Sequence, residues 1–130
     1  MKPMKRKKPH VLVVEGDNGA RDVLKKMLES DGYEVTAVAD GMRGLEQLTK
    51  PDIHWDVITM HSIPRFGTTA ITARDLLKQI RVRSDVSVIL ITGGVVDEQE
   101  ILDAGFAAVI RKPVGRDDLL ATIAKVIATK

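Results

Sequence analysis

The stretch VLVVEGD, residues 11–17, decides the fold. Its first four residues are apolar and mostly β-branched, which is typical of a strand covered on both faces. Asp17 then stands where a side chain accepts hydrogen bonds from the first N–H groups of a helix. A buried strand that leads directly into a helix is the repeating unit of an α/β sheet.

The same unit recurs four more times along the chain. Apolar runs predict further strands at residues 33–38, 57–60 and 86–91, and Gly105 leads to a fifth strand that ends at Ile110. Helical spacing of apolar residues follows each strand, and it is carried by Ala20, Val23, Leu24, Met27 and Leu28 before Gly32, by residues 40–48, by Ala73, Leu76, Leu77 and Ile80, by residues 98–104, and by Leu120, Ile123, Ala124 and Ile127 within residues 116–128. Five such units predict an open, doubly wound parallel sheet with its functional crevice beyond the carboxyl ends of the strands.

Length and composition fit one globular domain. The chain has 130 residues, 44% of them hydrophobic and 29% charged. It contains no cysteine, so it needs no oxidising compartment, and the cytoplasm is the expected location. No apolar run approaches the ~20 residues of a membrane span, and the opening MKPMKRKKPH lacks the apolar stretch of a signal peptide. We therefore expect neither membrane insertion nor export.

The basic residues are unevenly placed. Residues 1–9 form a tail that holds Lys2, Lys5, Arg6, Lys7 and Lys8, while all 18 acidic residues of the chain follow it. The domain itself, residues 10–130, is therefore mildly acidic despite a net charge of +2. A charge run without interleaved aromatic residues is more typical of a solvated end than of a nucleic-acid or membrane contact, so neither contact is expected.

The expected strand ends carry a recognisable set of residues. They are Glu15-Gly16-Asp17, Met60 to Pro64, Thr92-Gly93 and Lys112-Pro113. Together with the segments VITMHSIP, VILITGG and AGFAAVIRKPV, they make residues 10–128 resemble the receiver domains of response regulators. This resemblance implies a flavodoxin-like, CheY-like fold with five parallel strands in the order 2-1-3-4-5 and five helices. It also implies a role in two-component or phosphorelay signal transduction.

The chain departs from the family pattern at three positions. The second of two adjacent acids is replaced by Gly16, and the phosphoacceptor aspartate, four residues before Pro64, is replaced by Met60. A thioether cannot form an acyl phosphate. The switch aromatic, three residues before the lysine, is replaced by Val109. Mg²⁺ requires oxygen ligands, so Gly16 and Met60 predict weak or absent Mg²⁺ binding and no other cofactor.

Two family residues are retained, since Thr92 and Lys112 match the hydroxyl and ammonium that bind phosphoryl oxygens in active relatives. We interpret the chain as a pseudo-receiver rather than an enzyme, one that acts by protein–protein interaction. The resemblance implies a histidine kinase or another receiver as partner, and a homodimer surface within about residues 95–128. No helix-turn-helix follows within these residues, so DNA binding is not expected unless the chain is a fragment.

Other interpretations stay open. Sliding the alignment by one residue makes His61 the acceptor of a conventional regulator, at the cost of the spacing to Pro64. A flavodoxin-like nucleotide- or cofactor-binding enzyme shares the architecture, although no cofactor motif is present. His10, His54 and His61 lack metal-ligand spacing, and none is assigned catalysis.

Purely structural roles are also available to the retained residues. Lys112 could form a partly buried ion pair with Glu15, and Thr92 could cap the following turn. Asp17 could be a simple helix cap, or could hold a weak cation together with Glu15. By resemblance, the peptide between Lys112 and Pro113 is commonly cis, which would set the direction of the last helix.

Overall fold

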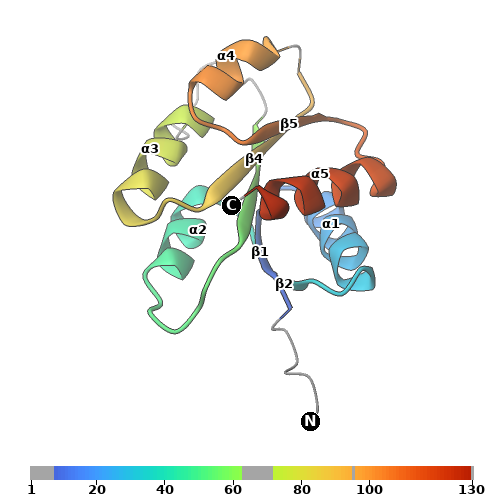
Figure 1. Ribbon diagram of the computed structural model, residues 1–130, viewed down its shortest axis with the longest axis horizontal. Coiled ribbons are helices and arrows are strands. Elements are labelled where there is room, and N and C mark those ends of the chain that lie inside the picture. The colour runs from blue at the N-terminus through green and yellow to red at the C-terminus, as the bar shows by residue number, and fades with distance from the viewer. Residues whose placement is uncertain (1–7, 63–71, 95, 130) are drawn as a thin grey trace.

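A computed structural model shows five parallel strands and five helices in strict alternation (Figure 1). The structure describes residues 8–62, 72–94 and 96–129, so most of the basic tail and the expected loop at residues 64–67 lie outside the described residues. The elements are β1 (His10–Val14), α1 (Asn18–Ser30), β2 (Glu34–Val38), α2 (Gly41–Leu48), β3 (Val57–Ser62), α3 (Ala73–Arg83), β4 (Ser87–Thr92), α4 (Glu98–Asp103), β5 (Ala108–Arg111) and α5 (Arg116–Ala128).

The strand order is β2-β1-β3-β4-β5, which confirms the flavodoxin-like sheet. Because every strand is parallel, all five carboxyl ends lie at one edge and all amino ends at the opposite edge. None of the helices in the described parts of the chain is both long and apolar enough to cross a membrane.

The alternating side chains of the strands build one apolar cluster on each face of the sheet. Leu12, Ile58 and Leu90 point to the face covered by α2 and α3, whereas Val13 and Ile89 point to the face covered by α1 and α5. Figure 1 shows α2 and α3 on one side of the sheet, with α1 and α5 on the other. Burial on both faces explains why the central strands read as continuous apolar runs.

Local signals in the sequence explain where the helices begin and where turns occur. The N–H of Ala20 donates to Asp17 Oδ2 at 2.7 Å, so Asp17 caps α1 as predicted. Asp40 caps α2 in the same way, through Arg43 N at 2.9 Å. Gly105 adopts a φ of +112° between α4 and β5, a backbone conformation that residues other than glycine rarely adopt.

Two helix faces differ from the prediction. In α1, Val23 is 49% exposed, while Leu24 and Leu28 fill the core. In α5, the fully buried side chains are Leu119, Ile123 and Val126, and the predicted core residue Ala124 is exposed. Leu120 and Ile127 pack only partly. Both apolar stripes satisfy helical spacing, and the bulkier set fills the space against the sheet.

The first strand is held at its start by three side chains. The N–H of His10 donates to Asp56 Oδ2 at 2.8 Å, and His10 Nε2 lies 2.8 Å from Thr36 Oγ1. The imidazole also packs against Trp55, with ring centroids 4.3 Å apart. These contacts tie β1 to β2 and to the segment that precedes β3.

The revised face of α1 gives a stability prediction. Leu28→Ala should lower the free energy of unfolding by about 2–4 kcal/mol, because it removes a fully buried side chain and leaves a cavity. The matched change Val23→Ala should stay within about 0.5 kcal/mol, because Val23 is half exposed. Urea unfolding followed by circular dichroism measures both values. Equal losses would contradict the orientation of α1.

Candidate functional site

The candidate site lies at the carboxyl edge of the sheet, where the topology brings four strand ends together. Glu15 follows β1, His61 lies near the end of β3, Thr92 is the last residue of β4 and Lys112 follows β5. We call the site formed by these four residues the crevice. Parallel strands place such residues side by side although they are far apart in the sequence.

Glu15 is the centre of the crevice. Its side chain is 1% exposed, and Oε1 lies 3.0 Å from Lys112 Nζ. The other oxygen, Oε2, accepts a hydrogen bond from the N–H of Asp17 at 3.1 Å. A buried carboxylate is costly unless it is paired and hydrogen-bonded, and Glu15 satisfies both conditions. The ion pair considered from the sequence is therefore present.

Lys112 is held by its backbone as well as by its ammonium. Its N–H donates to the carbonyl of Thr92 at 2.9 Å, and its peptide bond with Pro113 is cis. The side chain of Lys112 is 28% exposed, so its ammonium reaches Glu15 from the rim of the crevice. A side chain built on Gly93 would come within 3.8 Å of the Lys112 chain, so the lysine stem passes close to this glycine.

The hydroxyl of Thr92 has a local partner. Its Oγ1 accepts a hydrogen bond from the N–H of Gly94 at 3.2 Å, and the residue is 1% exposed. This is the turn-capping role that threonine commonly has at the end of a strand. Val109, at the position of the switch aromatic, is half-buried and pairs with Leu90 across the sheet.

Met60 and His61 point in different directions because β3 continues to Ser62, two residues beyond its predicted end. The extension pairs His61 with Ile91 of β4. The side chain of Met60 is 1% exposed and belongs to the apolar cluster beneath α2 and α3. His61 Nδ1 lies instead 3.5 Å from Glu15 Oε1, and both ring nitrogens are covered from solvent.

Sequence reasoning did not predict the contact between His61 and Glu15. The contact follows from the register seen in the structure, where Val14 pairs with Met60 and the next residues along each strand are Glu15 and His61. The helix residue Arg21 was missed as well. Its Nη1 donates to the backbone carbonyl of Glu15 at 2.9 Å and so holds the start of the loop between β1 and α1.

A cavity of about 380 Å³ opens beside His61, between the ends of β1 and β3 and the start of α2. Its wall is largely apolar and includes Met42, Met60 and Leu76. A side chain built at Gly16 would meet only Ala39 O at 3.5 Å, an ordinary contact distance, so an acid at residue 16 is not excluded sterically.

The side chains of the crevice do not form a set of ligands suited to Mg²⁺, which needs several oxygens in octahedral geometry. Gly16 has no side chain, Met60 offers only a buried thioether, and the Glu15 carboxylate contacts Lys112. The described residues contain no cluster of three or more His, Cys, Asp or Glu side chains suited to a metal. Asp17 is occupied as the cap of α1.

This fold and this arrangement of strand-end residues define a receiver. The model of the response regulator receiver domain matches residues 11–124, so the chain belongs to the response regulator receiver family. Members of this family are signalling modules of two-component systems. The assignment confirms the family predicted from the strand-end residues.

Curated relatives are similar along nearly the whole chain. The sensory transduction protein RegX3 of Mycobacterium tuberculosis is 30% identical over 120 residues, which cover 90% of this chain and 50% of RegX3. The transcriptional regulatory protein CseB of Streptomyces coelicolor is 33% identical over 122 residues, which cover 91% of this chain and 49% of CseB. The chain thus spans about half the length of these relatives.

Solved receiver structures have the same fold. The CheY-like receiver domain from Methanospirillum hungatei superposes with a TM-score of 0.79 at 27% identity, over 95% of this chain and 96% of that one. The receiver domain of the sensor histidine kinase PA1611 from Pseudomonas aeruginosa, solved with a magnesium ion in its active-site cleft, gives a TM-score of 0.78 at 24% identity, over 94% of this chain and 99% of that one.

The buried pair in the crevice gives the second prediction. Lys112→Met should lower the free energy of unfolding at neutral pH by about 1–3 kcal/mol, because it removes the ammonium beside a buried carboxylate. The upper values for buried pairs do not apply, since the ammonium is partly exposed. Adding Glu15→Gln should recover part of the loss.

The exposed pair Lys26–Asp22 supplies the control for this experiment. Its atoms are 2.9 Å apart but both side chains are largely exposed, so Lys26→Met should leave the free energy of unfolding nearly unchanged. Chemical unfolding of the wild type, Lys112→Met, Glu15→Gln and the double variant forms a double-mutant cycle for Glu15 and Lys112, with Lys26→Met measured beside it. Strict additivity of the two crevice substitutions would refute their coupling.

Proposed function

We propose that this receiver module acts without aspartyl phosphorylation and signals by binding a protein partner. The observation that carries the proposal is Met60, a buried core side chain at the position of the family's acceptor aspartate. Gly16 and Val109 add the loss of a metal-binding acid and of the switch aromatic. Weak or absent Mg²⁺ binding is part of the same proposal.

The pairing of Lys112 supports a fixed conformation. By resemblance to the family, this ammonium approaches the phosphoryl group after phosphorylation. In this chain the ammonium of Lys112 lies 3.0 Å from Glu15 Oε1. The backbone N–H of Lys112 also donates a hydrogen bond to the carbonyl of Thr92. A lysine that already has a carboxylate partner needs no phosphoryl group to hold it at the crevice.

Phosphorylation of His61 is the alternative within the same family. The contact between Nδ1 and Glu15 favours it, because a carboxylate commonly orients a reactive imidazole. The coverage of both ring nitrogens argues against it, since a phosphoryl donor must reach one of them. The burial of the ring makes this the weaker of the two proposals.

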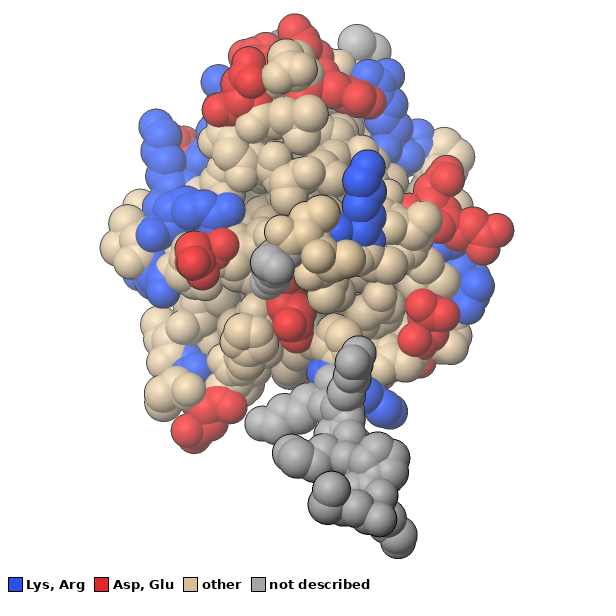
Figure 2. Space-filling view, in the orientation of Figure 1, with Lys and Arg blue, Asp and Glu red and all other residues tan. Residues whose placement is uncertain are grey.

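The partner is proposed to be a histidine kinase or another receiver, and a second copy of the chain would bind through α4, β5 and α5. Figure 2 shows acidic side chains gathered over α4, which carries Glu98, Glu100 and Asp103. Arg111 of β5 lies 3.4 Å from Glu98, and Leu102 is 40% exposed between the acids. A surface of this kind fits a partner with complementary basic groups around an apolar contact.

Intact-protein mass spectrometry tests the proposed loss of phosphorylation. After incubation with acetyl phosphate and Mg²⁺, the mass should be unchanged, while a reactive receiver treated in parallel gains one phosphoryl group. A stoichiometric gain by this chain would overturn the proposal. If the gain disappears in His61→Ala, the alternative acceptor is established instead.

A gain-of-function variant tests the cause of the loss. The double substitution Gly16→Asp and Met60→Asp places carboxylates at the two positions where the proposal has them lost, in a chain that retains Thr92 and Lys112. The Met60 side chain lies in the apolar cluster under α2 and α3, so a carboxylate there must turn toward the crevice to react. We expect Mg²⁺-dependent phosphorylation of this variant and none of Gly16→Asp alone. Circular dichroism checks that the double variant folds, because the substitution of Met60 brings a carboxylate into a buried position. A folded but unreactive double variant would show that these two losses are not the cause.

A further inference from the structure

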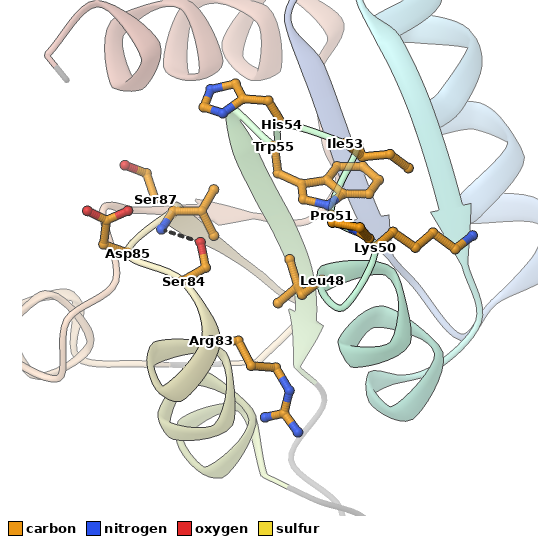
Figure 3. A pocket seen from close by; sticks show the side chains of 11 residues that line it. Leu48, Lys50, Pro51, Ile53, His54, Trp55, Arg83, Ser84, Asp85 and Ser87 are labelled. Carbon is orange, nitrogen blue, oxygen red and sulfur yellow. Dashed lines mark hydrogen bonds between the residues drawn. The ribbon is translucent and has the colours of Figure 1, made fainter.

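A second cavity lies at the opposite edge of the sheet from the crevice. It has a volume of about 580 Å³ and lies between the connections α2–β3 and α3–β4 (Figure 3). Cavities of about 300–1,000 Å³ are the usual size of small-molecule sites. We call this cavity the amino-edge pocket. None of its lining residues belongs to the crevice.

The apolar wall of the amino-edge pocket is suited to a flat ring. Leu48, Pro51 and Trp55 line it, and Figure 3 shows the indole of Trp55 lying beside Pro51, with Ser84 across from Leu48. The indole is 7% exposed and is braced from outside the pocket by the ring of His10. Its Nε1 is buried and has no hydrogen-bond acceptor among the described residues, which is an unfavourable state for a donor.

The polar groups of the pocket are mostly donors. Ser84 Oγ accepts from the N–H of Val86 at 3.1 Å, which leaves the hydroxyl proton available to donate. Lys50 lines the mouth and makes no ion pair with any carboxylate of the described residues. Asp85 is the one carboxylate among the lining residues. A ligand that matches this inventory must be rich in acceptor oxygens.

The carboxyl ends of two helices near the pocket determine whether Arg83 or Lys50 is available to bind an anion. Helices α2 and α3 both end at this edge, and their carbonyl ends carry partial negative charge that opposes an anion. Arg83 offsets this charge at α3, where its Nη1 donates to Gln79 O at 3.0 Å. The ammonium of Lys50 therefore remains for a ligand, although its side chain extends away from the pocket in Figure 3 and must turn inward.

We propose that the amino-edge pocket binds a small aromatic carboxylate. The ring packs against Pro51 and Trp55, and the carboxylate accepts hydrogen bonds from Lys50 and, once the ligand displaces the cover over the indole, from Trp55 Nε1, which is closed to solvent in this structure as the ring nitrogens of His61 are. This site is separate from the crevice, so it does not depend on whether the chain is phosphorylated. It would give the receiver a chemical input of its own.

The test uses the full chain and one built-in reporter. Trp55 is the single tryptophan, so proton–nitrogen correlation NMR shows one indole N–H signal. The probe is 2-naphthoate, which should shift this signal saturably with a dissociation constant of about 1 mM, as expected for a ligand with about a dozen heavy atoms. Its uncharged analogue 2-naphthamide should bind at least about fivefold more weakly, because it lacks the charged acceptor.

Three variants separate the contributions. Lys50→Gln should weaken 2-naphthoate binding about five- to tenfold, whereas Lys78→Gln, which removes an exposed lysine outside the pocket, should leave it unchanged. Trp55→Phe keeps a ring but removes the donor, and should weaken binding several-fold when it is followed by the fluorescence of the probe. Each variant is checked for folding by circular dichroism.

Three results would overturn the proposal. The first is the absence of a saturable shift with 2-naphthoate. The second is equal binding of 2-naphthoate and 2-naphthamide, which would mark the pocket as merely apolar. The third is an equal loss in Lys50→Gln and Lys78→Gln, which would reduce the effect to the overall charge of the protein.

Discussion

The crevice depends on one buried carboxylate. Glu15 follows the first strand, Lys112 follows the last, and the ion pair between them joins residues 97 positions apart in the sequence. Since Glu15 is almost completely covered, its charge must be balanced within the protein, and Lys112 and the N–H of Asp17 provide that balance. This need for charge balance holds the loops after β1 and β5 close together, whether or not any phosphoryl chemistry occurs there.

The last residues of β3 contribute to different parts of the molecule. A carboxylate in place of His61, whose ring lies beside Glu15, would add a second negative charge there, and like charges at close range destabilise each other. Met60 instead extends the apolar cluster under α2 and α3, where a flexible thioether fills irregular space well. The apolar side chain of residue 60 thus adds to the core of the fold. Stability and reactivity make different demands on this strand end.

The fold could be predicted from the sequence because its signals are local and repeated. Five apolar strands, the caps Asp17 and Asp40 and the turn at Gly105 each specify one element, and parallel topology then determines where the strand ends meet. The errors concern choices between neighbours, such as Leu119 over Ala124 in α5, which packing against the sheet decides. The contact between His61 and Glu15 was missed because it depends on how far β3 continues, a property of its pairing with β4.

The anchoring of His10 has a mechanical consequence. Its backbone N–H, its imidazole nitrogen and its ring face are each engaged, by Asp56, Thr36 and Trp55 respectively. A pulling force applied upstream of this residue is thus shared between the backbone hydrogen bonds of β1 and side chains from two segments, β2 and the residues that precede β3. A shift of β1 by one residue would break all three contacts at once, so the anchor fixes the register of this strand against β2.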